Sequence, residues 1–103
     1  MRFVPVLYES ADEFISCRWS SGGEGVTVLG DTSELPLGED VLLEIKVRGT
    51  PEQAVVRGTV IWKREREDAH HNLPTGAGVK FHERDLDRVT ELTTRLRGVH
   101  QSP

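Results

Sequence analysis

The chain has 103 residues, of which 36% are hydrophobic and 29% charged, a profile that fits one soluble globular domain and excludes a disordered chain. Its formal charge of −4 is uneven: the first forty residues carry two basic and eight acidic side chains, which disfavours nucleic acid and other polyphosphate ligands there. No apolar run approaches the ~20 residues of a membrane span, and the N-terminal stretch is too short for a signal peptide, so we expect a cytoplasmic single domain over residues 1–103.

Five segments have the composition and punctuation of β-strands: Phe14–Trp19, Gly25–Leu29, Val41–Arg48, Gln53–Lys63 and Pro74–Phe81. The third alternates apolar and charged residues, so it has one buried face. In the fourth, Val56, Val60 and Trp62 are expected to share the inner face, with Gly58 at a bend between them. The side chains that we expect in the core of the sheet are Val41, Leu43, Ile45, Val56, Val60, Trp62, Val79 and Phe81.

The end of the chain has a helical pattern. Apolar residues recur at three- and four-residue steps, which predicts a helix over about 85–97 that packs on the sheet through Leu86, Val89, Leu92 and Leu96. Asp85 is suited to cap its start and Gly98 to end it. We expect the strands to span about residues 12–82 and residues 99–103 to form a mobile tail.

Few residues point to chemistry. Cys17 is the single cysteine, which excludes an internal disulfide and a multi-cysteine zinc site and favours a place in the core. His70 and His71 beside Asp68 have no further metal ligand near them in sequence, so we assign them to a solvated loop over 63–73. No catalytic motif is present, and we expect neither an enzyme nor a metal site.

The order of these segments resembles the PilZ domain, in particular the stand-alone versions found in gliding and predatory bacteria. The resemblance covers about residues 12–97. Its strongest parts are the sequence Gly58-x-Val60-x-Trp62 at the end of the long strand and Gly76-x-Gly78-Val79-x-Phe81 in the next. It implies a mainly β fold, a six-stranded antiparallel β-barrel with a C-terminal α-helix packed against it.

Many members of this family are receptors for cyclic di-GMP, which they bind through an Arg-x-x-x-Arg motif and an Asp/Asn-x-Ser-x-x-Gly motif. Here the second motif falls on residues 18–23, where Ser20 and Gly23 match but Arg18 replaces the acidic or amide residue. Arginine has only donors, whereas that position accepts hydrogen bonds from guanine. The first motif is missing, because Arg2 is the sole arginine upstream and Val6 stands four residues after it.

The resemblance therefore implies a non-enzymatic adaptor without a cofactor, which acts through protein contacts in bacterial motility, polarity or surface regulation. Two alternatives stay open: a cyclic di-GMP receptor that uses Arg18, Ser20 and Gly23, and a small nucleic-acid-binding barrel. For the protein interface we predict Arg18 and Trp19, since a few arginine or aromatic anchors usually dominate such contacts. Trp19 has a second interpretation as a core residue, and the mixed charges of Lys63–Asp68 offer an alternative docking surface.

Overall fold

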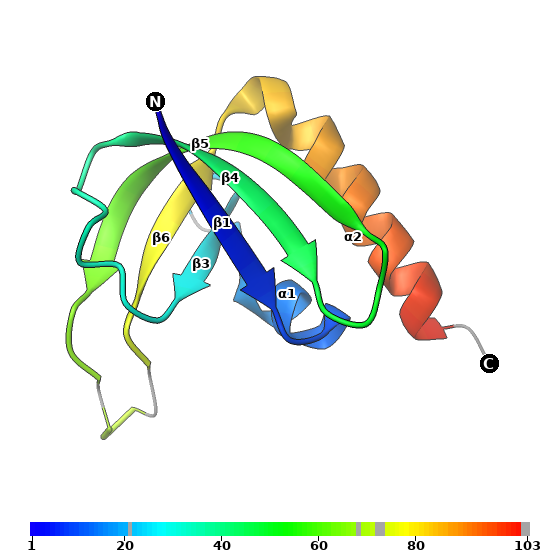
Figure 1. The fold of residues 1–103 in the computed structure, drawn as a ribbon, viewed down its shortest axis with the longest axis horizontal. Coiled ribbons are helices and arrows are strands. Elements are labelled where there is room, and N and C mark those ends of the chain that lie inside the picture. The colour runs from blue at the N-terminus through cyan, green and yellow to red at the C-terminus, as the bar shows by residue number, and fades with distance from the viewer. Residues whose placement is uncertain (21, 68, 72–73, 102–103) are drawn as a thin grey trace.

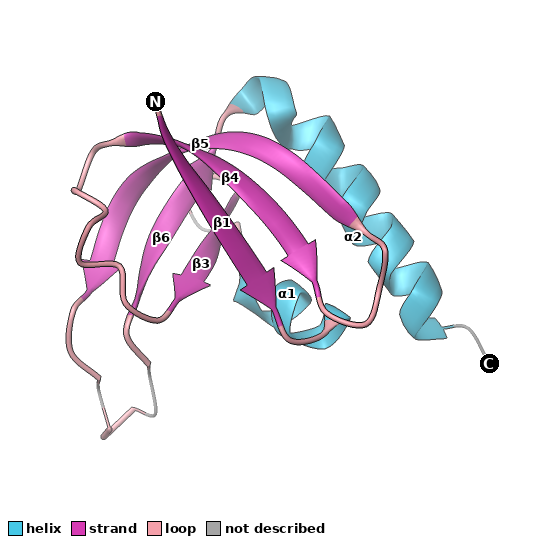
Figure 2. Ribbon diagram, viewed as in Figure 1, coloured by secondary structure: helices cyan, strands magenta, loops and turns pink. Residues whose placement is uncertain are grey.

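The computed structural model describes residues 1–20, 22–67, 69–71 and 74–101. It contains a curved sheet with a long helix across one side and a short helix at one end (Figures 1 and 2). The elements, in chain order, are β1 (Arg2–Tyr8), α1 (Ala11–Cys17), β2 (Arg18–Trp19), β3 (Gly25–Leu29), β4 (Asp40–Val47), β5 (Gln53–Arg64), β6 (Gly76–Phe81), the 3₁₀ helix η1 (Glu83–Asp85) and α2 (Leu86–Gln101).

The six strands form one mixed sheet in the order β1-β4-β5-β6-β3-β2. β1 runs parallel to β4, and the other neighbours are antiparallel. The expected closed antiparallel barrel is therefore wrong in two respects. β1 and the two-residue β2 do not pair, so they form the two edges of an open sheet. β1 pairs with β4, from the middle of the chain.

The N-terminal elements differ most from the expectation. Residues 14–17, predicted as a strand, belong to α1, and only Arg18 and Trp19 are extended. Ser10 caps this helix, because its hydroxyl accepts a hydrogen bond of 3.0 Å from the Glu13 N–H. The Glu13 carboxylate in turn accepts one of 3.1 Å from the Glu9 N–H, an arrangement close to a capping box. This local capping favours a helix over the strand that the apolar residues alone predicted.

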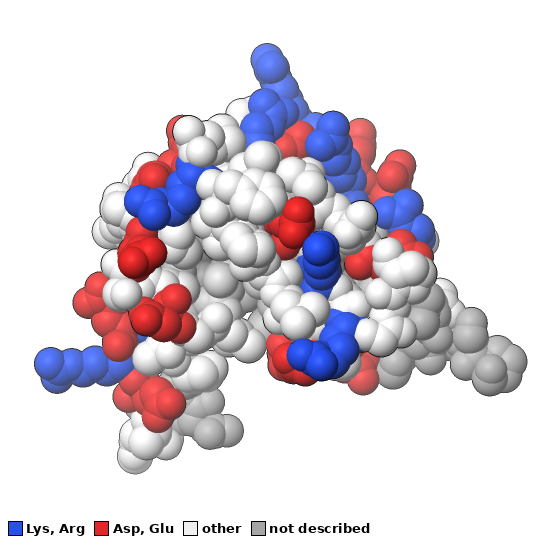
Figure 3. Space-filling model, in the orientation of Figure 1, with Lys and Arg blue, Asp and Glu red and all other residues white. Residues whose placement is uncertain are grey.

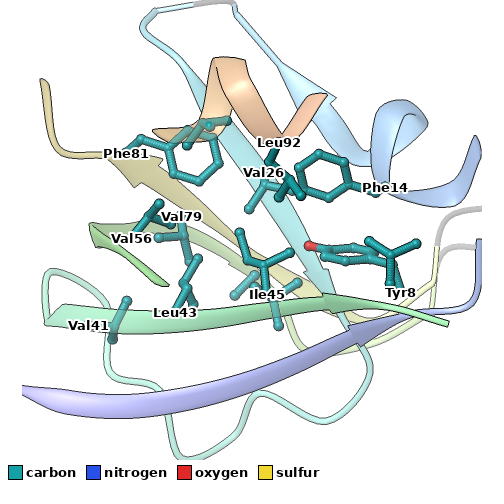
Figure 4. Packing of buried hydrophobic residues seen from close by; sticks show 14 of the residues in the cluster. Tyr8, Phe14, Val26, Val41, Leu43, Ile45, Val56, Val79, Phe81 and Leu92 are labelled. Atoms are coloured by element: carbon teal, nitrogen blue, oxygen red, sulfur yellow. The ribbon is translucent and has the colours of Figure 1, made fainter. Parts of the chain in front are cut away.

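The core lies between the concave face of the sheet and the two helices, as Figure 4 shows. The predicted inner residues of the sheet are buried except for Trp62, and Val89, Leu92 and Leu96 of α2 pack on them. Leu86 is partly buried at the rim of the same cluster. Tyr8 and Phe14, from elements that were not foreseen, meet edge to face with their ring centroids 5.2 Å apart.

Trp62 lies on the opposite face from the one predicted. The register shifts between Val60 and Trp62, so that Val60 pairs with Val79 but Trp62 pairs with Gly78. Such a bulge adds one residue and turns every later side chain to the other face. The half-buried indole covers Gly78 on the outer surface, where an added Cβ would lie 2.0 Å from Trp62 Nε1. A glycine is therefore required beneath this ring.

The connection from the sheet to α2 depends on a buried carboxylate. Asp85 does not cap the helix as predicted; it accepts hydrogen bonds from the Arg57 backbone N–H (2.8 Å), Nε (3.0 Å) and Nη2 (3.1 Å). The side-chain hydrogen bond from Arg57 lowers the pKa of Asp85 to about 2. α2 continues to Gln101, so Gly98 lies within the helix and residues 99–101 are helical instead of forming a mobile tail, while 102–103 lie outside the described residues.

Candidate functional site

Arg18 lies on β2, where the resemblance placed the degenerate motif, and its guanidinium is bound within the protein. Nη1 donates to Thr93 Oγ1 of α2 at 2.8 Å, and Nη2 donates to Glu24 Oε2 at 2.5 Å. Its Cζ also lies 5.7 Å from the centroid of the Phe81 ring. The side chain is 20% exposed. Arg18 thus joins the end of the sheet to the C-terminal helix.

Trp19 lies between the two interpretations of its role. It is half-buried, and its ring covers Gly25, where an added Cβ would lie 2.2 Å from Cζ2. Within the described residues, Nε1 of Trp19 and Nε of Arg18 are buried without a hydrogen-bond partner. Trp19 is therefore partly buried at the edge of the sheet, which agrees fully with neither interpretation.

Ser20 and Gly23 flank the turn after β2, and Ser21 lies outside the described residues. Ser20 is exposed, while Gly23 has φ 124° and is so close to Lys80 that an added Cβ would lie 2.6 Å from Lys80 Cε. An open pocket of about 510 Å³ adjoins this turn. Its lining brings Lys80, His82 and Thr59 beside Gly23. Sequence reasoning missed these three residues because β5, β6 and the residue after β6 supply them from far along the chain.

Arg2 cannot substitute for the missing arginine motif. It belongs to β1, at the opposite edge of the sheet from Arg18, and its Nε forms an ion pair with Glu39 Oε1 at 3.1 Å. The structure therefore brings Arg18, Trp19 and Gly23 together at one edge and leaves Arg2 at the other.

The remaining reactive side chains of the described residues form no metal site. His70 and His71 are exposed with ring centroids 5.0 Å apart, and Asp68 lies outside the described residues. Over the ranges that the structure describes, no three His, Cys, Asp or Glu side chains gather as a metal ion would need. Cys17 is half-buried against the core, and this burial raises the pKa of its thiol. Of the helices in these ranges, none is long and apolar enough to cross a bilayer.

Comparison with known proteins agrees with this geometry. A family model described as the PilZ domain matches residues 9–98, which extends slightly beyond the predicted 12–97. A search of the curated proteins found no match. PilZ domains are in general binding modules and not enzymes, and they serve as cyclic di-GMP receptors or as adaptors. The match covers most of the chain, from α1 through β6 and most of α2, and leaves β1 outside it. The chain belongs to the PilZ domain family.

Proposed function

We propose that this PilZ domain is an adaptor that works through protein contacts and does not bind cyclic di-GMP in the family's usual mode. The observation that carries the proposal is the position of the Arg18 guanidinium, which is bound by Glu24 and Thr93 where a receptor presents a free acceptor to guanine. The family's role points to a partner protein in bacterial motility, polarity or signalling.

The energetics support this proposal. Glu24 and Thr93 already hold two of the five N–H groups of Arg18, and turning the guanidinium toward a ligand phosphate would break these two bonds, at a cost of about 1–2 kcal/mol. The missing arginine pair removes the two guanidinium groups that would repay this cost. Arg2 is held at the far edge by Glu39. The usual binding mode therefore lacks its strongest contacts.

Arg18 and Trp19 stay our predicted interface anchors. Because both side chains are largely covered, a substitution at either position acts on the fold as well as on binding, so each variant must first be shown to be folded. Their small exposed surface also favours a second contact region elsewhere on the domain.

A calorimetric titration with cyclic di-GMP tests the proposal. We expect a Kd weaker than about 100 μM for the unmodified domain. The Arg18→Asp variant restores an acceptor at this position without the arginine pair, and we expect it to bind no better. A low-micromolar affinity that Arg18→Ala abolishes, with circular dichroism unchanged, would contradict the proposal.

One observation favours the receptor alternative. Lys80 lies against Gly23 and brings a positive charge to the pocket beside the degenerate motif. If cyclic di-GMP does bind at micromolar concentration, Lys80→Ala should weaken it at least tenfold, as loss of one charge-assisted bond does. Arg2→Ala is the matched control from the other edge and should leave the affinity unchanged.

A further inference from the structure

The outer edge of β1 carries unused backbone hydrogen-bonding groups. β1 pairs with β4 alone, and on that side the Tyr8 carbonyl accepts from the Arg48 N–H at 2.8 Å. Backbone groups alternate in direction along a strand, so those of Phe3, Pro5 and Leu7 point away from β4. The presence of proline at position 5 agrees with this assignment, because proline has no N–H to donate to a neighbouring strand. Among the described residues, none forms a hydrogen bond with the backbone groups of Phe3, Pro5 or Leu7.

A cleft of about 420 Å³ lies along this free edge. β1 forms one wall, and Val28, Leu29 and residues 31–35 form the other. Apolar side chains border it: Phe3 is 53% exposed, Leu7 50% and Leu29 39%. We call the outer edge of β1 together with this hollow the edge cleft. An unpaired edge of seven residues with exposed apolar side chains is a ready template for another strand.

The lining of the edge cleft is mainly acidic, which favours a positively charged ligand. Glu13, Asp31 and Glu34 line it, whereas among its described lining residues only Arg2 is basic, and Arg2 already pairs with Glu39. Hydrogen bonds from Ser33 lower the pKa of Asp31, so this carboxylate is charged at neutral pH. Figure 3 shows acidic side chains gathered over the β3–β4 connection beside a hollow next to β1. A basic occupant is favoured electrostatically.

We propose that the edge cleft binds an extended, basic segment of a partner protein, which adds to the sheet alongside β1. The inference rests on the proposed adaptor function and names where the partner binds and what chemistry it has. A second copy of this chain fits less well, because pairing two β1 strands would bring two sets of Glu13, Asp31 and Glu34 toward each other.

The geometry assigns a role to each side of the added strand. The N–H groups of Phe3 and Leu7 donate to it and their carbonyls accept from it, while Pro5 offers its carbonyl alone. Alternate side chains of an extended peptide point to opposite faces. One set then reaches Asp31 and Glu34 across the hollow, where Lys or Arg is favoured. The other set lies beside Phe3 and Leu7, where apolar residues are favoured.

Amide hydrogen exchange measured by NMR tests this directly. The probe is an eight-residue peptide of alternating valine and lysine, blocked at both ends. We expect the Phe3 and Leu7 amides to exchange quickly in the free protein and at least about tenfold more slowly with saturating peptide, while Val4 and Val6, which face β4, change little. A valine–glutamate peptide and a valine–lysine peptide interrupted by proline serve as controls, and neither should give this protection.

Three protein variants separate the contributions. Leu7→Pro removes one outward N–H without touching the β1–β4 ladder and should weaken peptide binding at least tenfold, whereas Leu7→Ala, its matched control, keeps that N–H and should weaken binding less. The double variant Asp31→Asn, Glu34→Gln should also weaken binding and reduce its salt dependence. Equal binding by Leu7→Pro and the unmodified domain overturns the proposal, as does the absence of protection at millimolar peptide.

Two further outcomes also count against it. Concentration-dependent protection of Phe3 and Leu7 without peptide would identify a second copy as the occupant. Protection confined to residues around Arg18 and Trp19 would move the interface to the other edge of the sheet. Neither outcome affects the adaptor proposal, which fails only if cyclic di-GMP binds tightly through the motif.

Discussion

The two edges of the sheet are treated differently by the fold. At the β2 edge, the strand has two residues, Trp19 covers the neighbouring Gly25, and Arg18 connects the edge to α2. At the β1 edge, the strand has seven residues, the backbone groups that point away from β4 have no partner among the described residues, and the Phe3 and Leu7 side chains are exposed. The resemblance places the second of the family's two ligand motifs, in degenerate form, at the first edge. In this chain that edge uses its arginine for internal contacts, and the second edge is where we propose that a partner binds.

The largest expected effect tests the packing of α2 in the core. Leu92 of α2 is fully buried, so Leu92→Ala should lower the free energy of unfolding by about 2–5 kcal/mol through the lost contacts and the cavity. Leu7→Ala removes the same side chain at the open edge and should cost less than about 0.5 kcal/mol, because Leu7 is half exposed. Urea denaturation of both variants measures the difference between their free energies of unfolding. A similar loss of stability in the two variants would show that Leu7 is packed as tightly as Leu92 and that β1 is not an exposed edge.

A smaller effect comes from the carboxylate that fixes α2 to the sheet. Asp85→Asn should destabilise the fold by about 1.5–3 kcal/mol at pH 7, because it weakens three hydrogen bonds from Arg57. The pKa of Asp85 is lowered in the folded state to about 2, from 3.8. Its stabilisation is thus complete above about pH 4 and disappears as the pH falls toward 2.

Urea midpoints between pH 5 and pH 2 check that prediction. The unmodified domain should lose stability over this range more steeply than Asp85→Asn, which lacks the titrating group. Parallel curves would mean that the carboxylate is not held in its ionised form by Arg57.

The smallest effect compares the two arginines. Arg18→Ala should cost about 1–2 kcal/mol, because its bonds to Thr93 and Glu24 are partly buried. Arg2→Ala should cost less than about 0.5 kcal/mol, since its pair with Glu39 lies at the surface. Thermal unfolding at low and high salt measures both. If Arg2→Ala proves the more damaging, the β1 edge depends on its charges more than on backbone pairing.

Much of the sheet and the C-terminal helix could be predicted, because alternation and helical spacing are properties of neighbouring residues. β3 to β6 and α2 appear close to their predicted positions. β1 was missed because Pro5 is unusual in strands, although its place at a free edge makes the proline compatible. The helix at 11–17 carried a readable signal in Ser10 and Glu13, which favour an N-cap. The reversal of Trp62 had no local signal, since a bulge depends on the partner strand.

The sequence shows how the motif departs from the family's pattern, but not how the Arg18 side chain is bonded. The motif's departures at Arg18 and the missing arginine pair are visible in the sequence. The hydrogen bond from Arg18 to Thr93, 75 positions away, depends on the tertiary structure and could not be predicted from the spacing of residues. The same holds for Lys80 against Gly23, which only the pairing of β3 with β6 brings together.

The parallel pairing of β1 with β4 also sets an order of events during synthesis. β1 ends at Tyr8 and its partner ends at Val47, so at ~5–20 residues per second a ribosome needs roughly 2–8 s to make β4 after β1 is complete. Throughout that interval Phe3 and Leu7 have no sheet to join. β1 is thus placed only after β4 has been made, and nascent chains should engage holdase chaperones through this segment until the β4–β5 hairpin emerges.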